Sequence, residues 1–275
     1  MRDELRLMCV LAHPDDESLG IGGTLAKYAD EGVTTYIVTA TRGEHGWFGD
    51  PQAYPGPERL GQIREAELRA AARVLGVRHV DVLDYIDGEL DQADPAEVST
   101  TIAWHIRRVR PDVVITFGPD GSYGHPDHIA ISQFTTAAVV RAADSGDDQD
   151  QAPAHHVAKL YYMAPTKHLL ATYQAVFGDL VMRIDGVQRC AAGWQDWAVT
   201  THIRTADYWR TVWAAVTCHR TQMPNYQALE RLPDEMQIGL WGLQTYYRAF
   251  SLVNGGRSVE DDLFAGMREV PAEGI

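Results

Sequence analysis

The chain has 275 residues, of which 45% are hydrophobic and 23% charged, a balance that is ordinary for globular proteins and excludes a disordered chain. Its formal net charge of −14 opposes binding to phosphate backbones and to anionic membrane surfaces, so we expect neither nucleic acid nor a membrane as a partner. The length is sufficient for one large core, and we predict a single α/β domain over residues 1–275.

The cysteine content and the N-terminal residues indicate the cellular compartment. Cys9, Cys190 and Cys218 are too few and too scattered for a disulfide framework. The sequence begins without the basic region and long apolar stretch of a secretion signal. It also has no run of about 18 apolar residues that could span a bilayer. We therefore expect a cytoplasmic protein.

The first predicted strand leads into a polar motif. Residues 5–11 form a short apolar run, Pro14 interrupts it, and residues 19–29 follow with helical periodicity. This order predicts a buried parallel strand that feeds a helix. His13 and the pair Asp15 and Asp16 then lie at the carboxyl end of the strand, where open α/β sheets bind their ligands.

A second strand is predicted over residues 34–40, which are rich in β-branched side chains. Arg42 follows it, and its fork of donors suits sugar hydroxyls and a structural ion pair about equally. Residues 44–57 contain glycines and three prolines, which predict a loop at the ligand end of the sheet. Trp47 in this loop can stack on a sugar face or pin the loop to the body of the protein.

The pattern of helix and strand then repeats. Helical periodicity runs over residues 58–75 and ends at Gly76, as is typical of a helix C-terminus. A third strand follows over residues 79–84, and Asp87 lies in the turn beyond it, where turn formation alone would explain an aspartate. A further helix is predicted over residues 95–108.

A second strand-to-helix junction contains the same residue types as the first. Residues 113–117 form an apolar strand, and the sequence Gly124-His125-Pro126-Asp127-His128 precedes a helical pattern over residues 129–141. The alternation as a whole predicts a three-layer, Rossmann-like, doubly wound and mainly parallel sheet with helices on both faces. In the strand order 3-2-1-4-5 the first and fourth strands are neighbours, and the two junctions face each other across a crevice.

The remaining chain is less informative. Residues 142–153 are polar and rich in turn formers, which predicts a surface loop. We expect residues 1–141 to contain the metal motifs and residues 154–275 to complete the fold and the rim of the site. Strands are expected at 159–164 and 180–184, and helices at 189–198 and 205–219. The aromatic stretch 240–247 fits a homo-oligomer interface or a cover over the core.

The two junctions together predict a metal site. Two imidazoles and a carboxylate, from His13, His128 and Asp16, form the ligand set of a catalytic Zn²⁺ that keeps a position open for water. The same donor set also suits ferrous iron. Because the adjacent side chains of Asp15 and Asp16 point apart, one carboxylate can bind metal while the other serves as a base. Each motif alone could merely cap a helix, but capping needs no histidine, and with His125 the junctions contain three.

These motifs resemble a known family. Ala12-His13-Pro14-Asp15-Asp16-Glu17 and Gly124-His125-Pro126-Asp127-His128 are similar to the two signatures of the LmbE/PIG-L-type zinc N-deacetylases, which remove acetyl groups from small molecules that contain N-acetylglucosamine. The similarity extends to residues 41–44, 64–76 and 87–88, and weakly to residues 219–222. It implies an amino-sugar substrate that Arg42 and Asp87 contact, with Trp47 as a further candidate.

The resemblance and the residues together predict a mechanism. Zinc activates a water, Asp15 takes the proton, and the oxyanion is stabilised by zinc and protonated His125, with Tyr123 as a further donor. Asp127 is expected to orient His125. Asp15 or His125 then protonates the leaving amine, and the products are acetate and a free amino sugar.

Two other functions stay open at this point. A doubly wound domain could bind a nucleotide or sugar, with the histidines as hydrogen-bond donors and no catalysis. A metal-dependent amidase could instead cleave a sugar-linked thiol conjugate. Metal content separates the first alternative from the enzyme, and the acid released from the substrate separates the second.

Overall fold

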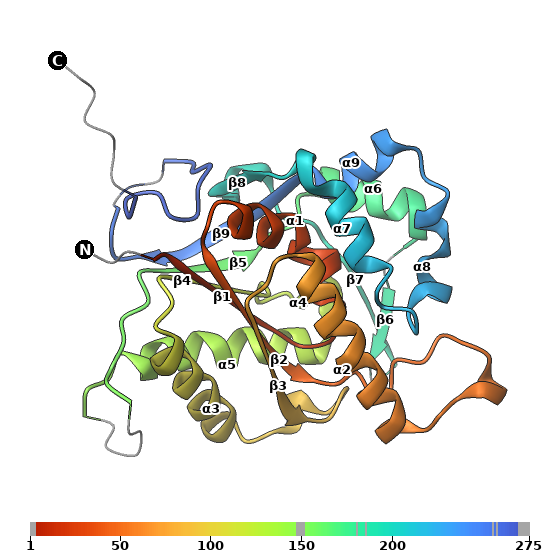
Figure 1. Ribbon diagram of the computed structural model, residues 1–275, viewed down its shortest axis with the longest axis horizontal. Coiled ribbons are helices and arrows are strands. Elements are labelled where there is room, and N and C mark those ends of the chain that lie inside the picture. The colour runs from red at the N-terminus through yellow and green to blue at the C-terminus, as the bar shows by residue number, and fades with distance from the viewer. Residues whose placement is uncertain are drawn as a thin grey trace.

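A seven-stranded sheet lies at the centre of the computed structural model, which describes residues 4–146, 152–179, 181–184, 186–254, 256 and 258–268 (Figure 1). Its strand order is β3-β2-β1-β4-β5-β9-β8. The strands of this sheet are β1 (Arg6–Leu11), β2 (Thr34–Thr41), β3 (His79–Tyr85), β4 (Val113–Thr116), β5 (Lys159–Met163), β8 (Thr201–Arg204) and β9 (Leu243–Ser251). A separate antiparallel hairpin is formed by β6 (Val181–Ile184) and β7 (Val187–Cys190).

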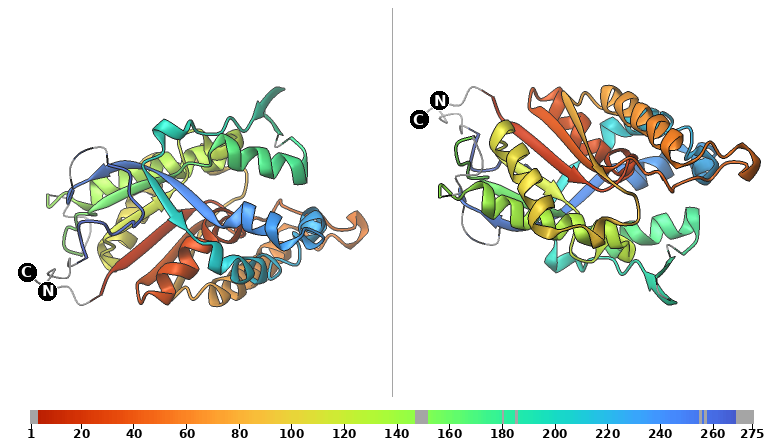
Figure 2. Two further views of the ribbon diagram at one scale, coloured as in Figure 1. Left: turned by 90° about the horizontal axis from the view of Figure 1, so that it is seen from above. Right: turned by 90° about the horizontal axis from the view of Figure 1, so that it is seen from below.

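Helices cover both faces of the sheet. Figures 1 and 2 show α3 and α5 on one face, and α1, α2 and α7 on the other. The helices are α1 (Asp16–Asp30), α2 (Pro57–Val74), α3 (Pro95–Val109), α4 (Gly121–Gly124), α5 (Pro126–Ala142), α6 (Lys167–Phe177), α7 (Trp209–Val216), α8 (Met223–Glu230) and α9 (Asp234–Trp241). Within the described ranges, no helix combines the length and the apolar character that crossing a bilayer requires. The predicted three-layer, doubly wound fold is confirmed.

The central strand β1 brings the two junctions together. Its residues from Leu7 to Leu11 are 0% exposed, because helices cover both faces of a parallel sheet. β1 pairs in parallel with β2 on one side and with β4 on the other, where Cys9 is opposite Ile115. The predicted order of the first five strands is therefore correct. The carboxyl ends of β1 and β4 lie side by side at one edge of the sheet.

Both junction helices begin three residues earlier than their apolar periodicity predicted. α1 begins at Asp16 rather than at residue 19, and α5 begins at Pro126 rather than at residue 129. An acidic residue suits the first turn of a helix, and proline suits its first position, so both motifs extend their helices toward the sheet. Asp16 and His128 therefore lie in first turns, at the sheet edge.

The second half of the chain adds antiparallel strands to the sheet. β9 pairs with β5, and β8 pairs with β9. The expected helix over residues 189–198 is wrong: Val187–Cys190 forms β7, which pairs with β6, and only a single 3-10 turn follows at Asp196–Ala198. Pairing with the adjacent strand in a hairpin overrides a weak helical pattern here. Residue 180 and residues 147–151 of the expected surface loop lie outside the described residues.

A buried ion pair holds the added strands to the parallel part of the sheet. Lys159 in β5 is 0% exposed, and its Nζ lies 2.7 Å from Oε1 of Glu260. Arg248 in β9 donates to the same oxygen at 2.7 Å, and the hydroxyl of Tyr161 donates to Oε2 at 2.6 Å. One carboxylate thus bonds to two cations in a largely buried region.

Replacing Glu260 with glutamine is expected to lower the free energy of unfolding by about 3–5 kcal/mol, because Lys159 would keep a buried charge without its partner. Urea unfolding followed by circular dichroism measures the loss. The control is Lys27→Gln, which removes a surface ion pair with Glu31 and should cost less than about 1 kcal/mol. Equal losses in the two variants would contradict this account.

The same pair predicts how stability depends on pH. Burial opposes ionisation of Glu260, but the contacts with Lys159 and Tyr161 lower its pKa below the ordinary value. Its contribution is therefore complete above the ordinary glutamate pKa and is lost as the pH falls through the folded-state pKa. The difference in stability between the wild type and Glu260→Gln should shrink in acid.

Candidate metal centre and active site

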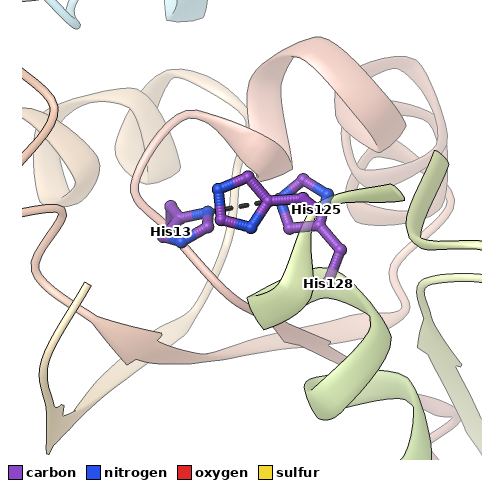
Figure 3. Close-up of side chains that lie close together, drawn as sticks. All are labelled: His13, His125 and His128. Carbon is purple, nitrogen blue, oxygen red and sulfur yellow. Dashed lines mark hydrogen bonds between the residues drawn. The ribbon is translucent and has the colours of Figure 1, made fainter. Parts of the chain in front are cut away.

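The three predicted metal ligands converge at the edge of the sheet. Nδ1 of His13 lies 3.2 Å from Nε2 of His128. Figure 3 shows the rings of these two residues close together, with His125 beside them. The carboxylate of Asp16 lies 3.5 Å from Nε2 of His128 and 3.9 Å from Nδ1 of His13. Ligand bonds of 2.0–2.2 Å in a tetrahedral site place donor atoms roughly 3.3 Å apart. The spacing and the chemistry of these donors fit a divalent metal ion.

Backbone groups hold the carboxylate of Asp16 in place. Its Oδ2 accepts hydrogen bonds from the N–H groups of Ala12, at 3.1 Å, and His13, at 2.8 Å. Its other oxygen faces His128. Burial opposes ionisation, but His128, His13 and these hydrogen bonds together lower the pKa of Asp16 to about 2. Asp16 is therefore ionised at neutral pH, as a metal-binding carboxylate must be.

The second nitrogen of His13 faces two carboxylates. Nε2 lies 2.9 Å from Oδ2 of Asp127 and 3.1 Å from Oδ1 of Asp87. A carboxylate at one ring nitrogen keeps the proton there and leaves the lone pair of the other nitrogen for a metal. Burial alone lowers the pKa of His13, but the bonds to Asp127 and Asp87 and the charge of Asp16 raise it to about 10.

Asp127 differs from its expected role. Its carboxylate accepts from the N–H groups of Gly88, at 2.7 Å, and Leu90, at 3.2 Å, and contacts His13. We expected this side chain to orient His125, but it orients His13 instead. The N–H groups of Gly88 and Leu90 reach Asp127 because the turn after β3 packs against α5.

Asp87 also has a partner that the sequence did not predict. One carboxylate oxygen lies at His13, and the other accepts from the N–H of His45 at 3.1 Å. Burial opposes ionisation, but the contact with His13 dominates and lowers the pKa of Asp87. Contact with a substrate stays a prediction for Asp87. The ring of His45 lies against the backbone carbonyl of Asp87, with Nδ1 at 2.8 Å from the oxygen.

Two further groups of three possible ligands overlap this centre. They are His13 with His125 and His128, and His13 with Asp87 and Asp127. The second group uses Nε2 of His13, which already bonds to both carboxylates. We favour the group with Asp16, because a single atom, Nδ1 of His13, faces His128 and the Asp16 carboxylate together.

His125 and His128 are stacked beside one another at the start of α5. The ring of Phe117 stacks on His128 with centroids 3.8 Å apart, and His125 stacks on His128 at 4.6 Å. Nδ1 of His125 accepts from the N–H of Asp127 at 3.2 Å, so the proton of the neutral ring is assigned to Nε2. Burial and the charges of His13 and His128 lower the pKa of His125 to about 4. The environment favours a neutral donor over the expected imidazolium.

Tyr123 lies beside the same rings. Its ring meets His128 edge-on at 5.4 Å and His125 edge-on at 6.0 Å. The turn that presents it is strained, because the preceding residue, Ser122, has a φ of 65°. Burial raises the pKa of Tyr123, so its hydroxyl keeps its proton and can donate.

Asp15 has different partners from its neighbour Asp16. Its Oδ2 accepts from the hydroxyl of Tyr226 at 2.9 Å and from Nη2 of Arg64 at 3.3 Å. Its backbone has a φ of 104°, which is rare outside glycine. Burial and the charge of Asp16 raise the pKa of Asp15 against the opposing effect of Arg64.

Sequence reasoning missed Arg64 and Tyr226. Arg64 in α2 is 3% exposed and donates to the carbonyls of Gly43, at 2.9 Å, and Pro14, at 2.6 Å. The available signal was the similarity of residues 64–76 to the family, which begins at this arginine. Tyr226 lies 211 residues from Asp15, and no motif surrounds it.

The structure favours a structural ion pair over substrate contact for Arg42. Its Nε lies 2.8 Å from Glu65 and its Nη1 lies 2.7 Å from Asp84, which is the ion-pair role that the sequence left open. Trp47 donates from Nε1 to the carbonyl of Asp50 at 3.1 Å, within its own loop. Substrate contact stays a prediction for both residues.

Comparison with known proteins agrees with the motifs. The family model for PIG-L, GlcNAc-PI de-N-acetylase, matches residues 8–139, which include both junctions. A mycothiol S-conjugate amidase of Streptomyces coelicolor is 32% identical and covers 98% of this chain and 99% of its own length. A 1D-myo-inositol 2-acetamido-2-deoxy-alpha-D-glucopyranoside deacetylase of Kineococcus radiotolerans is 33% identical, over 95% of this chain and 83% of its own length.

Solved structures show the same fold. A conserved protein from Thermus thermophilus has a TM-score of 0.65 and 26% identity, over 91% of this chain and 97% of its own. The N,N'-diacetylchitobiose deacetylase from Pyrococcus horikoshii has a TM-score of 0.64 and 22% identity, over 90% and 84%. These similarities and the two junction motifs show that the chain belongs to the PIG-L (LmbE-like) family of de-N-acetylases. It is an enzyme that hydrolyses amide bonds.

Proposed function

We propose that the protein is a zinc-dependent deacetylase that removes the N-acetyl group from a small molecule containing N-acetylglucosamine. The observation that carries the proposal is the convergence of Nδ1 of His13, the Asp16 carboxylate and Nε2 of His128. The substrate class follows from relatives named as deacetylases of an acetamido-glucopyranoside of inositol. The three free cysteines are in keeping with the cytoplasm as its location.

The metal would be held by His13, Asp16 and His128, with Asp127 and Asp87 fixing the His13 ring from its other side. When bound, zinc supplies a Lewis acid and makes a water nucleophilic near pH 7. We favour zinc over iron because two imidazoles and one carboxylate are a frequent zinc set, although ferrous iron accepts them too.

The protein's own groups then divide the proton chemistry. Asp15 accepts the proton of the attacking water, and Nε2–H of neutral His125 donates to the carbonyl oxygen as it gains charge, with the Tyr123 hydroxyl as a second donor. Burial raises the pKa of Asp15, which helps this carboxylate to hold the proton that it has accepted. Asp15 then returns the proton to the amine as the C–N bond breaks. The products are acetate and a free amine.

Acetate release from a panel of N-acetylglucosamine conjugates tests the function directly. We expect the purified enzyme to release acetate and a primary amine in equal amounts from at least one inositol or malate conjugate. The panel includes a sugar-linked thiol conjugate whose amine carries an acyl group larger than acetyl. Cleavage of that amide alone, with no acetate from any conjugate, would refute the deacetylase and indicate an amidase.

Two alanine variants separate metal binding from proton transfer. His128→Ala should lose bound metal and turnover together, because it removes a donor atom. Asp15→Ala should keep its metal but lose about 10²- to 10⁴-fold in kcat, because it removes only the base. Metal content by mass spectrometry and kcat are measured on the same samples. The exposed His156 supplies the control, since His156→Ala should retain both.

Metal affinity is expected to rise with pH. The pKa of His13 is about 10 in the metal-free site, so a metal must displace the Nδ1 proton at any lower pH. The apparent association constant should therefore increase about tenfold per unit between about pH 6 and pH 9. Competition titrations with a chelator measure this slope. Affinity that is constant across the range would contradict a protonated His13 in the metal-free site.

A further inference from the structure

A buried ion pair connects α1 to the chain after α7. Nε2 of His219 lies 2.7 Å from Oε1 of Glu17, and both side chains are 0% exposed. The other oxygen of Glu17 accepts from the backbone N–H of Asp15 at 3.0 Å. The pair therefore holds the peptide of Asp15 at its unusual φ of 104°. No step of the proposed reaction uses Glu17 or His219.

The same segment contacts two other parts of the site. Thr221 donates from its N–H and its hydroxyl to Glu67 of α2, at 3.0 and 2.7 Å. Gln222 donates from Nε2 to the carbonyl of Gly46, in the loop after β2, at 2.8 Å. We call residues 219–226 the clamp segment, because they bind α1, α2 and this loop together. It lies outside residues 8–139, which match the family model.

Tyr226 ends the clamp segment and reaches the proposed base. Its hydroxyl donates to Oδ2 of Asp15 at 2.9 Å, and Arg64 donates to the same oxygen at 3.3 Å. Among the described residues, the hydrogen bonds of this carboxylate all go to Oδ2. Tyr226 and Arg64 therefore anchor Oδ2 and leave Oδ1 without a hydrogen bond to the described residues.

The ring of Tyr226 has a separate structural task. It is 9% exposed and lies in a small apolar cluster with Leu229 and Trp241, next to Phe177 at 6.4 Å. Phenylalanine would keep this packing and remove only the hydroxyl. The two tasks of the side chain can therefore be separated by a single-atom change.

We propose that Tyr226 is a positioning residue: its hydroxyl, presented by the clamp segment, fixes Oδ2 of Asp15 so that Oδ1 accepts the proton from water. The inference rests on the proposed function only in that Asp15 is the base of an amide hydrolysis. It extends the working parts of the site to α8, in the half of the chain that was expected to form its rim.

Tyr226→Phe is the test. We expect kcat to fall about 10- to 100-fold, because a carboxylate held only by the longer contact with Arg64 is misplaced for part of the time. KM and metal content should stay within about twofold, since the ligands and the substrate surface are unchanged. A wild-type kcat, or a raised KM with kcat unchanged, overturns the inference.

Tyr173→Phe is the matched control. Tyr173 packs against the same cluster, and its hydroxyl donates to the carbonyl of Leu19 at 3.2 Å, without a contact to Asp15. It should keep kcat within about twofold of the wild type. Equal losses of kcat in the two variants would mean that any buried hydroxyl in the cluster matters, and would overturn a specific role for Tyr226.

A double variant shows whether Tyr226 acts through Asp15. In the Asp15→Ala background, Tyr226→Phe should change the residual rate by less than about twofold, because the group it positions is gone. Losses that multiply would overturn the inference. The same cycle measured on urea unfolding needs no substrate: coupling between the two changes supports the contact, and additive effects refute it.

These readouts separate the two proposals. Absence of acetate release by the wild type rejects the deacetylase, and the Tyr226→Phe comparison is then made with whichever amide of the panel the wild type cleaves. Equal kcat values for the wild type and Tyr226→Phe reject the positioning role while the deacetylase stands.

Discussion

The parallel pairing of β1 with β4 is the constraint on which the site depends. It aligns Cys9 with Ile115, so the chain leaves both strands at the same edge of the sheet. His13 and His128 are 115 residues apart in sequence, yet their ring nitrogens lie 3.2 Å apart because of this pairing. A buried strand cannot slip by one residue without turning its apolar side chains the wrong way, so the register of the two junctions is secure.

Within the site, the carboxylates divide into pairs with different tasks. Asp127 and Asp87 bond to one nitrogen of His13 and leave the other toward Asp16 and His128. Asp16 is anionic because backbone donors and histidines surround it, whereas burial raises the pKa of Asp15. These different surroundings support the proposal that one of two neighbouring aspartates is a metal ligand and the other a base.

The second half of the chain supplies more than a rim. It completes the sheet with β5, β9 and β8, which the buried Glu260 holds together. It also reaches the catalytic end through the clamp segment, in which Tyr226 bonds to the carboxylate of Asp15 and His219 bonds to Glu17, the acceptor for the N–H of Asp15. The stability of the sheet and the geometry of the proposed base therefore both depend on this half of the chain.

By itself the sequence determined the positions of the first five strands and of the two junctions, because apolar runs and the prolines and glycines between them are local signals. It also placed His13, Asp16 and His128 at those junctions, where the doubly wound strand order brings them together. Only the tertiary structure decided that Asp127 holds His13, that Arg42 is in an ion pair, that residues 187–190 form a strand and that Tyr226 reaches Asp15. Most of these are contacts between distant residues. No periodicity encodes them, because they arise when packed elements bring side chains from separate parts of the chain together.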